Sequence, residues 1–438
     1  MSRAQKLVNY VLPSVISFLS IFVFTIVDGV FVGRGVGTDA LGAVNIAFPY
    51  IMLFSAVTMC TTIGGLTITA IRKGRDDDEG AEEAFMHSLM LTVLVSVFFT
   101  VAGTFFVKSV SRLMGSNETF FDMVCDYIFW YSVFMVPCGL NMLFGGFVRN
   151  DGRPVLVSAA NIISTSLNIF GDWLLVFPLH MGLKGAAIAT GVSQTAAALI
   201  LLPHFFGSKG KLRFSKTAYN GKLCRKIIIR GLPECISQFN APLYTVFMNI
   251  VILRFLGDTA ENAFSVLGYV ASFSIAVFLG VAEGLQPLFG NCYGAGEKED
   301  LLWYRSAGVI IGFAGSLVLG VMIILAGKPI CLLYGLDDET MQLTLKAMPV
   351  FVSGFAIQSV TVILSSYLYS TTKTREAVTV NVFRSFIANT AVTFLLPVLI
   401  GPEAIWYALP FYEFLVLILA VAVTLRSDKR GVIGTSHE

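Results

Sequence analysis

The chain has 438 residues, of which 55% are hydrophobic and only 13% are charged, and its mean hydropathy is +0.77. Soluble domains carry about 25% charged residues, so this composition excludes a soluble globular enzyme, and it excludes a disordered chain, which needs low hydrophobicity and high net charge. With 30 basic and 28 acidic residues the formal net charge is +2, which gives no indication of nucleic-acid binding.

Apolar stretches long enough to cross a bilayer as helices recur along the whole sequence. A transmembrane helix needs roughly 20 apolar residues, and the stretches of this length predict an all-α polytopic membrane protein with twelve transmembrane helices. In chain order the predicted spans are 9–33, 43–70, 84–107, 123–148, 155–177, 184–206, 228–253, 262–290, 303–326, 344–370, 377–398 and 404–425.

The basic residues of the connecting loops predict the orientation of the chain. If the N-terminus, the even-numbered loops and the C-terminus face the cytoplasm, that side carries 22 Lys and Arg residues and the other side carries seven. Cytoplasmic loops of membrane proteins carry an excess of Lys and Arg. We therefore expect a multi-pass protein of the cytoplasmic (inner) membrane, with both termini in the cytoplasm.

A strongly basic segment at 207–227 separates the first six predicted spans from the last six. No other loop carries as many basic residues, and the number of spans is equal on its two sides. We therefore expect an N-terminal six-helix lobe over 1–206, a basic cytoplasmic linker over 207–227 and a C-terminal six-helix lobe over 228–438.

The two halves of the sequence resemble each other at a nearly constant offset. Because each half has an even number of spans, both halves enter the membrane from the same side, and their pseudo-two-fold axis runs along the membrane normal. This arrangement is typical of alternating-access transporters. The matching positions include Leu12-Pro13 with Leu232-Pro233, Arg34 with Arg254, and Gly65-Leu66 with Gly284-Leu285.

Several polar side chains of the first half lie at one depth in the predicted membrane. Asp28, Asp172 and Thr190 each lie about five or six residues inside the outer end of a span, roughly 8–9 Å below the membrane edge at 1.5 Å per residue. Asn168 lies one turn deeper than Asp172 on the same helix face. Carboxylate, amide and hydroxyl oxygens suit a hard cation such as Na⁺, or a proton. The alternative is helix–helix hydrogen bonding, the usual role of Asn and Thr within spans.

The fifth predicted span carries a continuous polar stripe. Asn161, Thr165, Asn168 and Asp172 follow one another at spacings of four, three and four residues, which places them on one helix face. In the sixth span, Thr190 and Gln194 repeat the four-residue spacing. We expect Asn161, Thr165 and Gln194 to line a cavity.

These residues resemble the multidrug and toxic compound extrusion (MATE) family, in particular the prokaryotic branch whose key acids lie in the N-terminal lobe. The resemblance covers essentially the whole chain. The residues that carry it are Pro13 in Leu-Pro-Ser, Asp28 in Ile-Val-Asp-Gly-Val-Phe-Val-Gly, Asn168-Ile-Phe-Gly-Asp172, Gly185-Ala-Ala-Ile-Ala-Thr190 and Gln286-Pro287.

The resemblance implies a cation-coupled antiporter that exports amphipathic, often cationic drugs or toxic compounds by alternating access. It implies that Asp28, Asn168, Asp172 and Thr190 bind the coupling ion, Na⁺ or H⁺, and that Pro13 allows the first helix to bend. We expect no cofactor, no enzymatic activity and no nucleic-acid partner, and we expect a monomer acting on small molecules. The chain departs from other MATE branches in having no acid in the tenth span, which leaves a cation site in the second lobe without support.

Two other functions fit the sequence less well. A lipid-linked oligosaccharide flippase shares the related two-lobe fold, but its cavity should contain several basic residues to hold a diphosphate, and Arg384 is the one Lys or Arg that we place well inside a predicted span. A membrane-embedded prenyltransferase would use an acidic motif such as 76–78, but the sequence has no second acidic cluster, and acids at the start of a helix are explained by the helix dipole.

In the second half, Glu283 and Arg384 lie at similar predicted depths, roughly 10 Å from the inner edge of the membrane. An unpaired charge at that depth costs several kcal/mol. We therefore expect Glu283 and Arg384 to form a buried ion pair; the alternative is that each side chain reaches separately toward the cytoplasmic surface.

Overall fold

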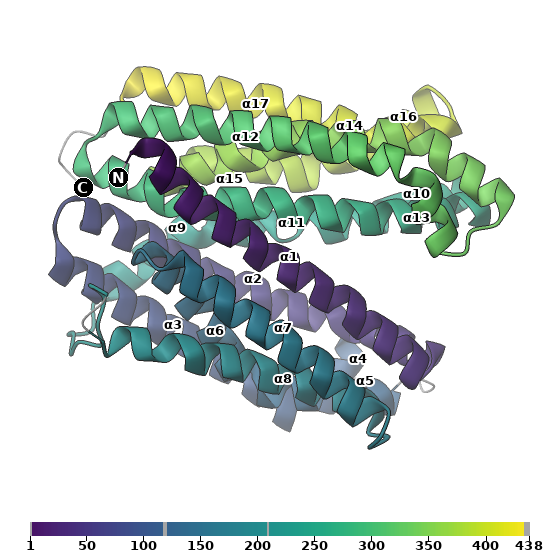
Figure 1. Cartoon of the computed structure of the whole chain (residues 1–438), viewed down its shortest axis with the longest axis horizontal. Helices are drawn as coiled ribbons and strands as arrows, with labels where there is room; N and C mark the ends of the chain where they lie inside the picture. Colours follow the sequence, from purple (N-terminus) through teal and green to yellow (C-terminus); the bar gives the residue numbers. More distant parts are fainter. Residues whose placement is uncertain (1, 117–120, 208–209, 433–438) are drawn as a thin grey trace. The chain divides into compact units, whose positions relative to one another are not determined.

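The computed structural model describes residues 2–116, 121–207 and 210–432, and within these ranges the chain is almost entirely helical, with no β-strand (Figure 1). The helices of the first half are α1 (Arg3–Gly35), α2 (Thr38–Gly74), α3 (Asp78–Phe105), α4 (Val107–Leu113), α5 (Phe121–Val133), α6 (Met135–Asn150), α7 (Pro154–Val176), α8 (Gly182–Leu201) and the 3₁₀-helix η1 (Leu202–Phe205).

The second half repeats this pattern of long helices. Its elements are α9 (Gly221–Ser237), α10 (Asn240–Phe255), α11 (Asp258–Ala295), α12 (Lys298–Leu325), α13 (Gly327–Leu333), α14 (Asp338–Ser370), α15 (Thr374–Val382), the π-helix η2 (Phe383–Ala388), α16 (Asn389–Leu399), the 3₁₀-helix η3 (Pro402–Tyr407) and α17 (Ala408–Arg430).

The described residues contain eleven helical stretches long and apolar enough to cross a membrane, and the bent pair α5 and α6 makes a twelfth. The two helices of that pair meet at an angle of 52°. Pro137 explains the position of the bend, because it has no amide hydrogen to donate to the carbonyl of Val133, the last residue of α5. The prediction of an all-α fold with twelve spans is therefore confirmed.

The chain divides into two compact units. The N-terminal unit comprises Leu12–Glu234, and the C-terminal unit comprises Met1–Val11 together with Cys235–Glu438. These units differ from the expected lobes at two points. The first turns of α1 group with the second half of the chain, and most of α9 groups with the first half. Each unit therefore contains a short helical segment from the opposite repeat.

Glycines allow each of these segments to approach its unit closely. In the N-terminal unit, a Cβ at Gly64 of α2 would overlap the carbonyl oxygen of Ile227, and a Cβ at Gly231 would overlap that of Cys60. In the C-terminal unit, a Cβ at Gly284 of α11 would lie 2.7 Å from the Cα atom of Val11. Gly284 is matched in the repeat to Gly65, the residue next to Gly64, so the two close approaches occur within one residue of equivalent positions.

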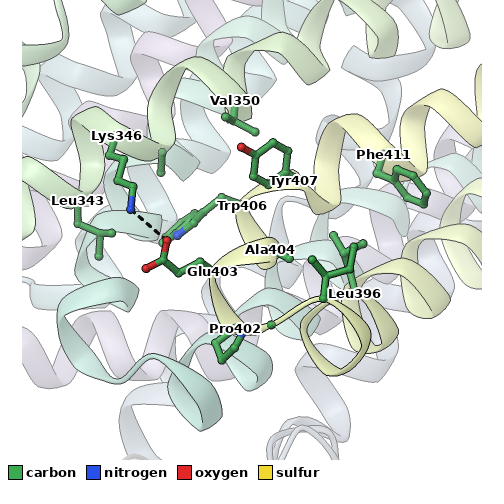
Figure 2. A pocket seen from close by; sticks show the side chains of 13 residues that line it. Leu343, Lys346, Val350, Leu396, Pro402, Glu403, Ala404, Trp406, Tyr407 and Phe411 are labelled. Atoms are coloured by element: carbon green, nitrogen blue, oxygen red, sulfur yellow. Dashed lines mark hydrogen bonds and ion pairs between the residues drawn. The ribbon is translucent and has the colours of Figure 1, made fainter.

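The C-terminal unit contains a cavity of about 610 Å³ at one end of its helices (Figure 2). The cavity lies between the first turns of α14, the end of α16, η3 and the start of α17. Its lining is mostly apolar, and an ion pair between Lys346 and Glu403 crosses it. The residues that line it include Leu343, Ala347, Val350, Leu396, Ile400, Trp406, Tyr407 and Phe411.

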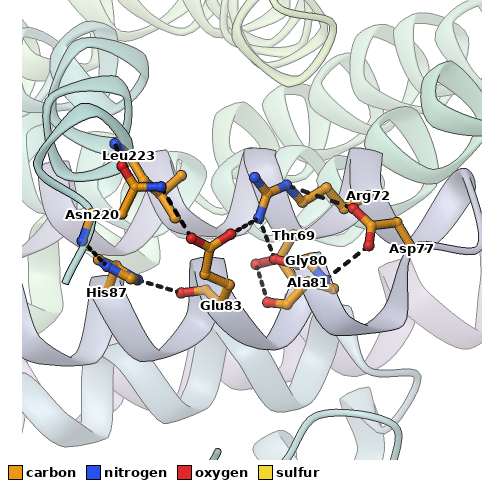
Figure 3. A network of polar contacts seen from close by, with 9 residues as sticks. All are labelled: Thr69, Arg72, Asp77, Gly80, Ala81, Glu83, His87, Asn220 and Leu223. Carbon is orange, nitrogen blue, oxygen red and sulfur yellow. Dashed lines mark hydrogen bonds and ion pairs between the residues drawn. The ribbon is translucent and has the colours of Figure 1, made fainter. Parts of the chain in front are cut away.

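Asn220, the residue of the basic segment that precedes α9, forms hydrogen bonds with α3 of the N-terminal unit (Figure 3). The backbone N–H of Asn220 donates to Nε2 of His87 at 2.9 Å, and its side-chain amide donates to Glu83 at 3.1 Å. The Oδ1 atom of Asn220 accepts from the N–H of Leu223 and so satisfies one of the free amides at the start of α9. Arg72 of α2 donates to the other oxygen of Glu83 at 2.9 Å. The residues before α9 are therefore fixed by α2 and α3.

Asp151, in the turn between α6 and α7, holds the preceding part of the same segment. Its carboxylate pairs with Lys73 and accepts a hydrogen bond from Nε2 of His204 at 2.8 Å. It also accepts from the backbone N–H groups of Lys211 at 2.9 Å and Leu212 at 3.2 Å. Burial acts to raise the pKa of the Asp151 carboxyl, but the hydrogen bond from His204 and the positive charge of Lys73 outweigh it and lower that pKa.

Candidate functional site

The two acids predicted to bind a cation face each other in the N-terminal unit. Asp28 lies on α1 and Asp172 on α7, and their carboxyl groups are within hydrogen-bonding reach. An ionised carboxylate can only accept hydrogen bonds. The two groups can therefore bond directly only when one of them carries a proton, and they repel each other when both are ionised.

The other two predicted residues complete one cluster with these acids. Asn168 lies one turn before Asp172 and within reach of its carboxyl group, and its side-chain amide donates to the hydroxyl of Thr190 on α8 at 3.3 Å. Asn168 and Asp172 are fully buried, and Thr190 is 6% exposed. The structure thus brings together the four residues that the sequence analysis selected.

The cluster contains buried oxygen atoms that receive no hydrogen bond. These atoms are Oδ1 of Asp28, Oδ1 of Asn168 and both carboxylate oxygens of Asp172. A buried acceptor without a donor costs about 1–3 kcal/mol, and more if it is charged. Within the described residues, no group of three or more His, Cys, Asp or Glu side chains is suited to a metal ion, so a cation here would use amide or hydroxyl oxygens besides the two carboxylates.

Hydrogen bonds connect α1 to the polar stripe of α7 along most of its length. Asn161 donates to the hydroxyl of Ser17 at 2.6 Å, and the hydroxyl of Thr165 donates to the carbonyl of Ser20 at 3.3 Å. The bonded or facing residues keep a sequence offset of 144 or 145, because the two helices run parallel in one register. These pairs are Ser158 with Pro13, Asn161 with Ser17, Thr165 with Ser20, and Asp172 with Asp28.

Asn161, Thr165 and Gln194 were expected to line a cavity, and in the structure each forms a hydrogen bond with a residue of another helix. Asn161 and Thr165 bond to α1, as described above. Gln194 of α8 accepts a hydrogen bond from the side-chain amide of Asn141 on α6 at 2.5 Å. The sequence analysis missed Ser17 and Ser20, although Pro13, Ser17, Ser20 and Asp28 share one helix face at spacings of four, three and eight residues.

Pro13 lies inside α1, two residues after the point where this helix passes from the C-terminal to the N-terminal unit. Proline has no amide hydrogen, so the carbonyl of Asn9 loses its usual helical donor. Pro233 occupies the same position in α9, just before the division at Glu234 and Cys235. Both helices that are shared between the units therefore contain a proline near the division.

The ion pair of Arg384 is different from the expected one. In the C-terminal unit, Nη2 of Arg384 lies 2.7 Å from Oε1 of Glu413 on α17, and Thr361 of α14 donates to the second oxygen of Glu413 at 2.9 Å. The sequence analysis named Glu283 as the partner of Arg384, whereas in the structure the carboxylate against Arg384 is that of Glu413. Arg384 belongs to the π-helix η2, a form that occurs mostly as short interruptions of α-helices.

Comparison with known proteins shows the family to which the chain belongs. The MatE family model matches residues 13–174 and 233–395, more than half of the chain, and the two matches begin at the equivalent prolines of the repeat. The chain is 26% identical to the probable multidrug resistance protein YoeA of Bacillus subtilis (strain 168) over 346 residues, which are 76% of this chain and 73% of that protein. It is 22% identical to a FAD transporter of Shewanella oneidensis over 427 residues, 94% of this chain and 92% of that protein.

A solved structure has the same fold. It is described as the outward-facing conformation of a multidrug resistance MATE family transporter of the MOP superfamily, and it superimposes with a TM-score of 0.91 at 20% identity over 98% of this chain and 96% of that one. The prenyltransferase alternative is therefore wrong. The chain belongs to the MATE family of multi-pass membrane transporters and is not an enzyme.

Proposed function

We propose that the protein is an antiporter that exports amphipathic, often cationic compounds and is driven by the binding of Na⁺ or H⁺ at Asp28, Asn168, Asp172 and Thr190. The observation that carries this proposal is the group of buried oxygen atoms without donors around two facing carboxyl groups. A cation or a proton satisfies these atoms, and hard cations prefer oxygen ligands.

The position of the cluster explains how binding could drive transport. Asp28 is on α1, whereas Asn168 and Asp172 are on α7, so an ion between them connects two helices. A ligand shifts a conformational equilibrium only by the difference in its affinity for the two states. In this mechanism the ion binds tightly when α1 lies against α7 as described here, and it is released when α1 bends away at Pro13.

The substrate and the location are also part of the proposal. YoeA is named as a multidrug resistance protein and the Shewanella oneidensis relative as a FAD transporter, so the relatives support export of small organic molecules. The excess of Lys and Arg on one side supports an inner-membrane protein with cytoplasmic termini. The buried pair of Arg384 with Glu413 argues against the flippase alternative, because this guanidinium already has a carboxylate partner and a diphosphate would have to displace it.

The test is efflux of a fluorescent organic cation from proteoliposomes under a Na⁺ gradient and, separately, a pH gradient. Asp28→Asn and Asp172→Asn should each abolish gradient-driven efflux while the purified protein stays monodisperse. Asp126→Asn, which changes an exposed acid on α5, is the matched control and should transport normally. Full activity of either cluster variant would contradict the proposed site, and absence of efflux under both gradients in the unmodified protein would contradict cation-coupled export.

A further inference from the structure

The cavity of the C-terminal unit is separate from the candidate cation site. It lies at the end of the helices where α14 begins and α16 ends, and Lys346 of α14 faces Glu403 of η3 across it (Figure 2). Its volume of about 610 Å³ falls within the 300–1,000 Å³ typical of small-molecule sites. The cavity is therefore large enough for an organic ligand.

Three polar groups of the cavity differ in kind. The Nζ atom of Lys346 lies 3.0 Å from Oε2 of Glu403, and their side chains are 70% and 75% exposed. Trp406 is 5% exposed, and its indole N–H is buried without a hydrogen-bond acceptor. The cavity thus offers one positive charge, one negative charge and one free indole donor, together with the hydroxyl of Tyr407, within a mostly apolar lining.

The ion pair can exchange partners at little cost. Exposed salt bridges contribute little to stability, so Lys346 and Glu403 lose little when each turns to a group on a ligand. The indole N–H of Trp406 gains a hydrogen bond if that ligand brings an acceptor, and a buried donor without a partner is unfavourable. A ligand with both charges therefore satisfies the site better than a ligand with one.

Side chains around the cavity are apolar and exposed. Leu399 and Ile400, at the end of α16, are 76% and 74% exposed, and Tyr407 is 56% exposed. Trp and Tyr are enriched where membrane helices meet the headgroup region, and α16 and α17 are spans whose ends adjoin the cavity. In a membrane these exposed apolar side chains would face lipid, so an acyl chain would have an apolar surface beside the cavity to cover.

We propose that this cavity binds a zwitterionic phospholipid, phosphatidylethanolamine. Its phosphate is held by Lys346 and the indole N–H of Trp406, its ammonium group by Glu403, and an acyl chain follows the apolar side chains at the end of α16. An anionic lipid such as phosphatidylglycerol supplies the phosphate but leaves Glu403 facing a negative charge. Phosphatidylcholine supplies both charges, but its quaternary ammonium has no N–H to donate. This site does not depend on the proposed transport function.

The test is native mass spectrometry of the full-length protein in detergent, titrated with each of the three lipids. We expect phosphatidylethanolamine to bind at least about fivefold more tightly than the other two, which corresponds to about 1 kcal/mol of binding free energy. Lys346→Gln should weaken its binding several-fold, and Glu403→Gln should remove the preference over phosphatidylglycerol. Both side chains are largely exposed, so these variants should fold. Lys328→Gln, at an exposed lysine of α13 outside the cavity, is the control and should bind normally.

A second measurement locates the lipid. In a variant that retains Trp406 while Trp130, Trp173 and Trp303 are replaced by Phe, phosphatidylethanolamine with a brominated acyl chain should quench the fluorescence. Ala404→Phe, which fills part of the cavity, should abolish that quenching. Equal binding of all three lipids, or binding that Lys346→Gln leaves unchanged, would overturn the proposal. Quenching that persists in Ala404→Phe would place the lipid elsewhere and overturn it as well.

Discussion

Arg384 donates two hydrogen bonds to the same oxygen of Glu413, from Nε at 2.8 Å and from Nη2 at 2.7 Å. Both side chains are almost completely buried, and Thr361 bonds the second oxygen of the carboxylate. A buried charge that loses its partner destabilises a protein by about 3–5 kcal/mol. The pair therefore connects η2, α14 and α17 through one carboxylate.

We predict that Glu413→Gln and Arg384→Gln each lower the melting temperature strongly, with losses of about 3–5 kcal/mol, and that the double variant is much milder than the sum. A double-mutant cycle of melting in detergent measures this coupling. The exposed pair Lys211 and Asp78 is the control, with an expected effect below about 1 kcal/mol. The same cycle between Arg384 and Glu283 should give a smaller coupling energy, and a larger one would restore the pairing first expected from the sequence.

Close packing of α9 on α2 leads to a second prediction. Gly231→Ala places a Cβ on the carbonyl oxygen of Cys60, and backbone atoms cannot move aside as a flexible side chain can. We expect this substitution to prevent assembly of the N-terminal unit, measured as loss of the monodisperse peak in size-exclusion chromatography. Gly268→Ala is the control, because a Cβ at Gly268 meets no atom within 4 Å. Equal yields of the two variants would contradict the close approach.

Asp151 should make the fold sensitive to acid. The pKa of its carboxyl group is lowered in the folded state, so the unfolded chain binds more protons at low pH. The stabilisation that Asp151 gives the fold is complete above the unfolded pKa of about 3.9. It is lost as the pH falls through the folded pKa. We expect Asp151→Asn to lower the stability at pH 7 by about 2–3 kcal/mol and to flatten the decline below about pH 4. Melting curves at several pH values measure this. Asp122→Asn, at an exposed acid of α5, should follow the unmodified protein.

Pro13 should affect the rate of transport more than the binding of the ion. Pro13→Ala restores an amide that can bond the carbonyl of Asn9, and this stiffens α1. We expect slower efflux with unchanged ²²Na⁺ or proton binding by the purified protein. Pro49→Ala in α2 removes a proline that does not adjoin the unit division, and it should leave the efflux rate nearly unchanged. Normal kinetics in Pro13→Ala would contradict the bending of α1.

Thr190 distinguishes the two coupling ions. Its hydroxyl can coordinate Na⁺ but has no proton to exchange at physiological pH, and in the structure it accepts from Asn168. Thr190→Ala should therefore reduce Na⁺-driven efflux several-fold more than H⁺-driven efflux. Thr195→Ala, at a hydroxyl that donates to the carbonyl of Gly191 in its own helix, is the control. An equal loss under both gradients would assign Thr190 a structural role.

The spans could be predicted from sequence because a helix that crosses a bilayer needs about 20 consecutive, mostly apolar residues. Few other structures need an apolar stretch of this length. The ends of the helices could not be predicted, because helices continue past the membrane: α2 extends from Thr38 to Gly74, beyond the predicted 43–70. Polar signals mark some ends more accurately. The carboxylate of Asp77 accepts a hydrogen bond from the backbone N–H of Gly80 and caps the start of α3. The carboxylate of Asp337 accepts from the backbone N–H of Thr340 and caps the start of α14.

The candidate site was easier to predict than the ion pair for a physical reason. Asn168 and Asp172 lie on one helix, so their spacing alone places them together, and a shared depth adds Asp28 and Thr190. The partner of Arg384 depends instead on which helices are neighbours. Glu283 and Glu413 both lie in apolar spans, and sequence spacing contains nothing that selects α17 over α11.

The exchange of helical segments between the two units has a consequence for synthesis. Residues 1–11 leave the ribosome long before Gly284, against which Val11 packs and which lies well into the second half of the chain. At about 5–20 residues per second, the interval between them is on the order of tens of seconds. During that time the tip of the first helix has no final binding surface, whereas α9 reaches Gly64 as soon as it emerges. The N-terminal unit can therefore mature during translation, but the C-terminal unit must recover a segment that was synthesised much earlier.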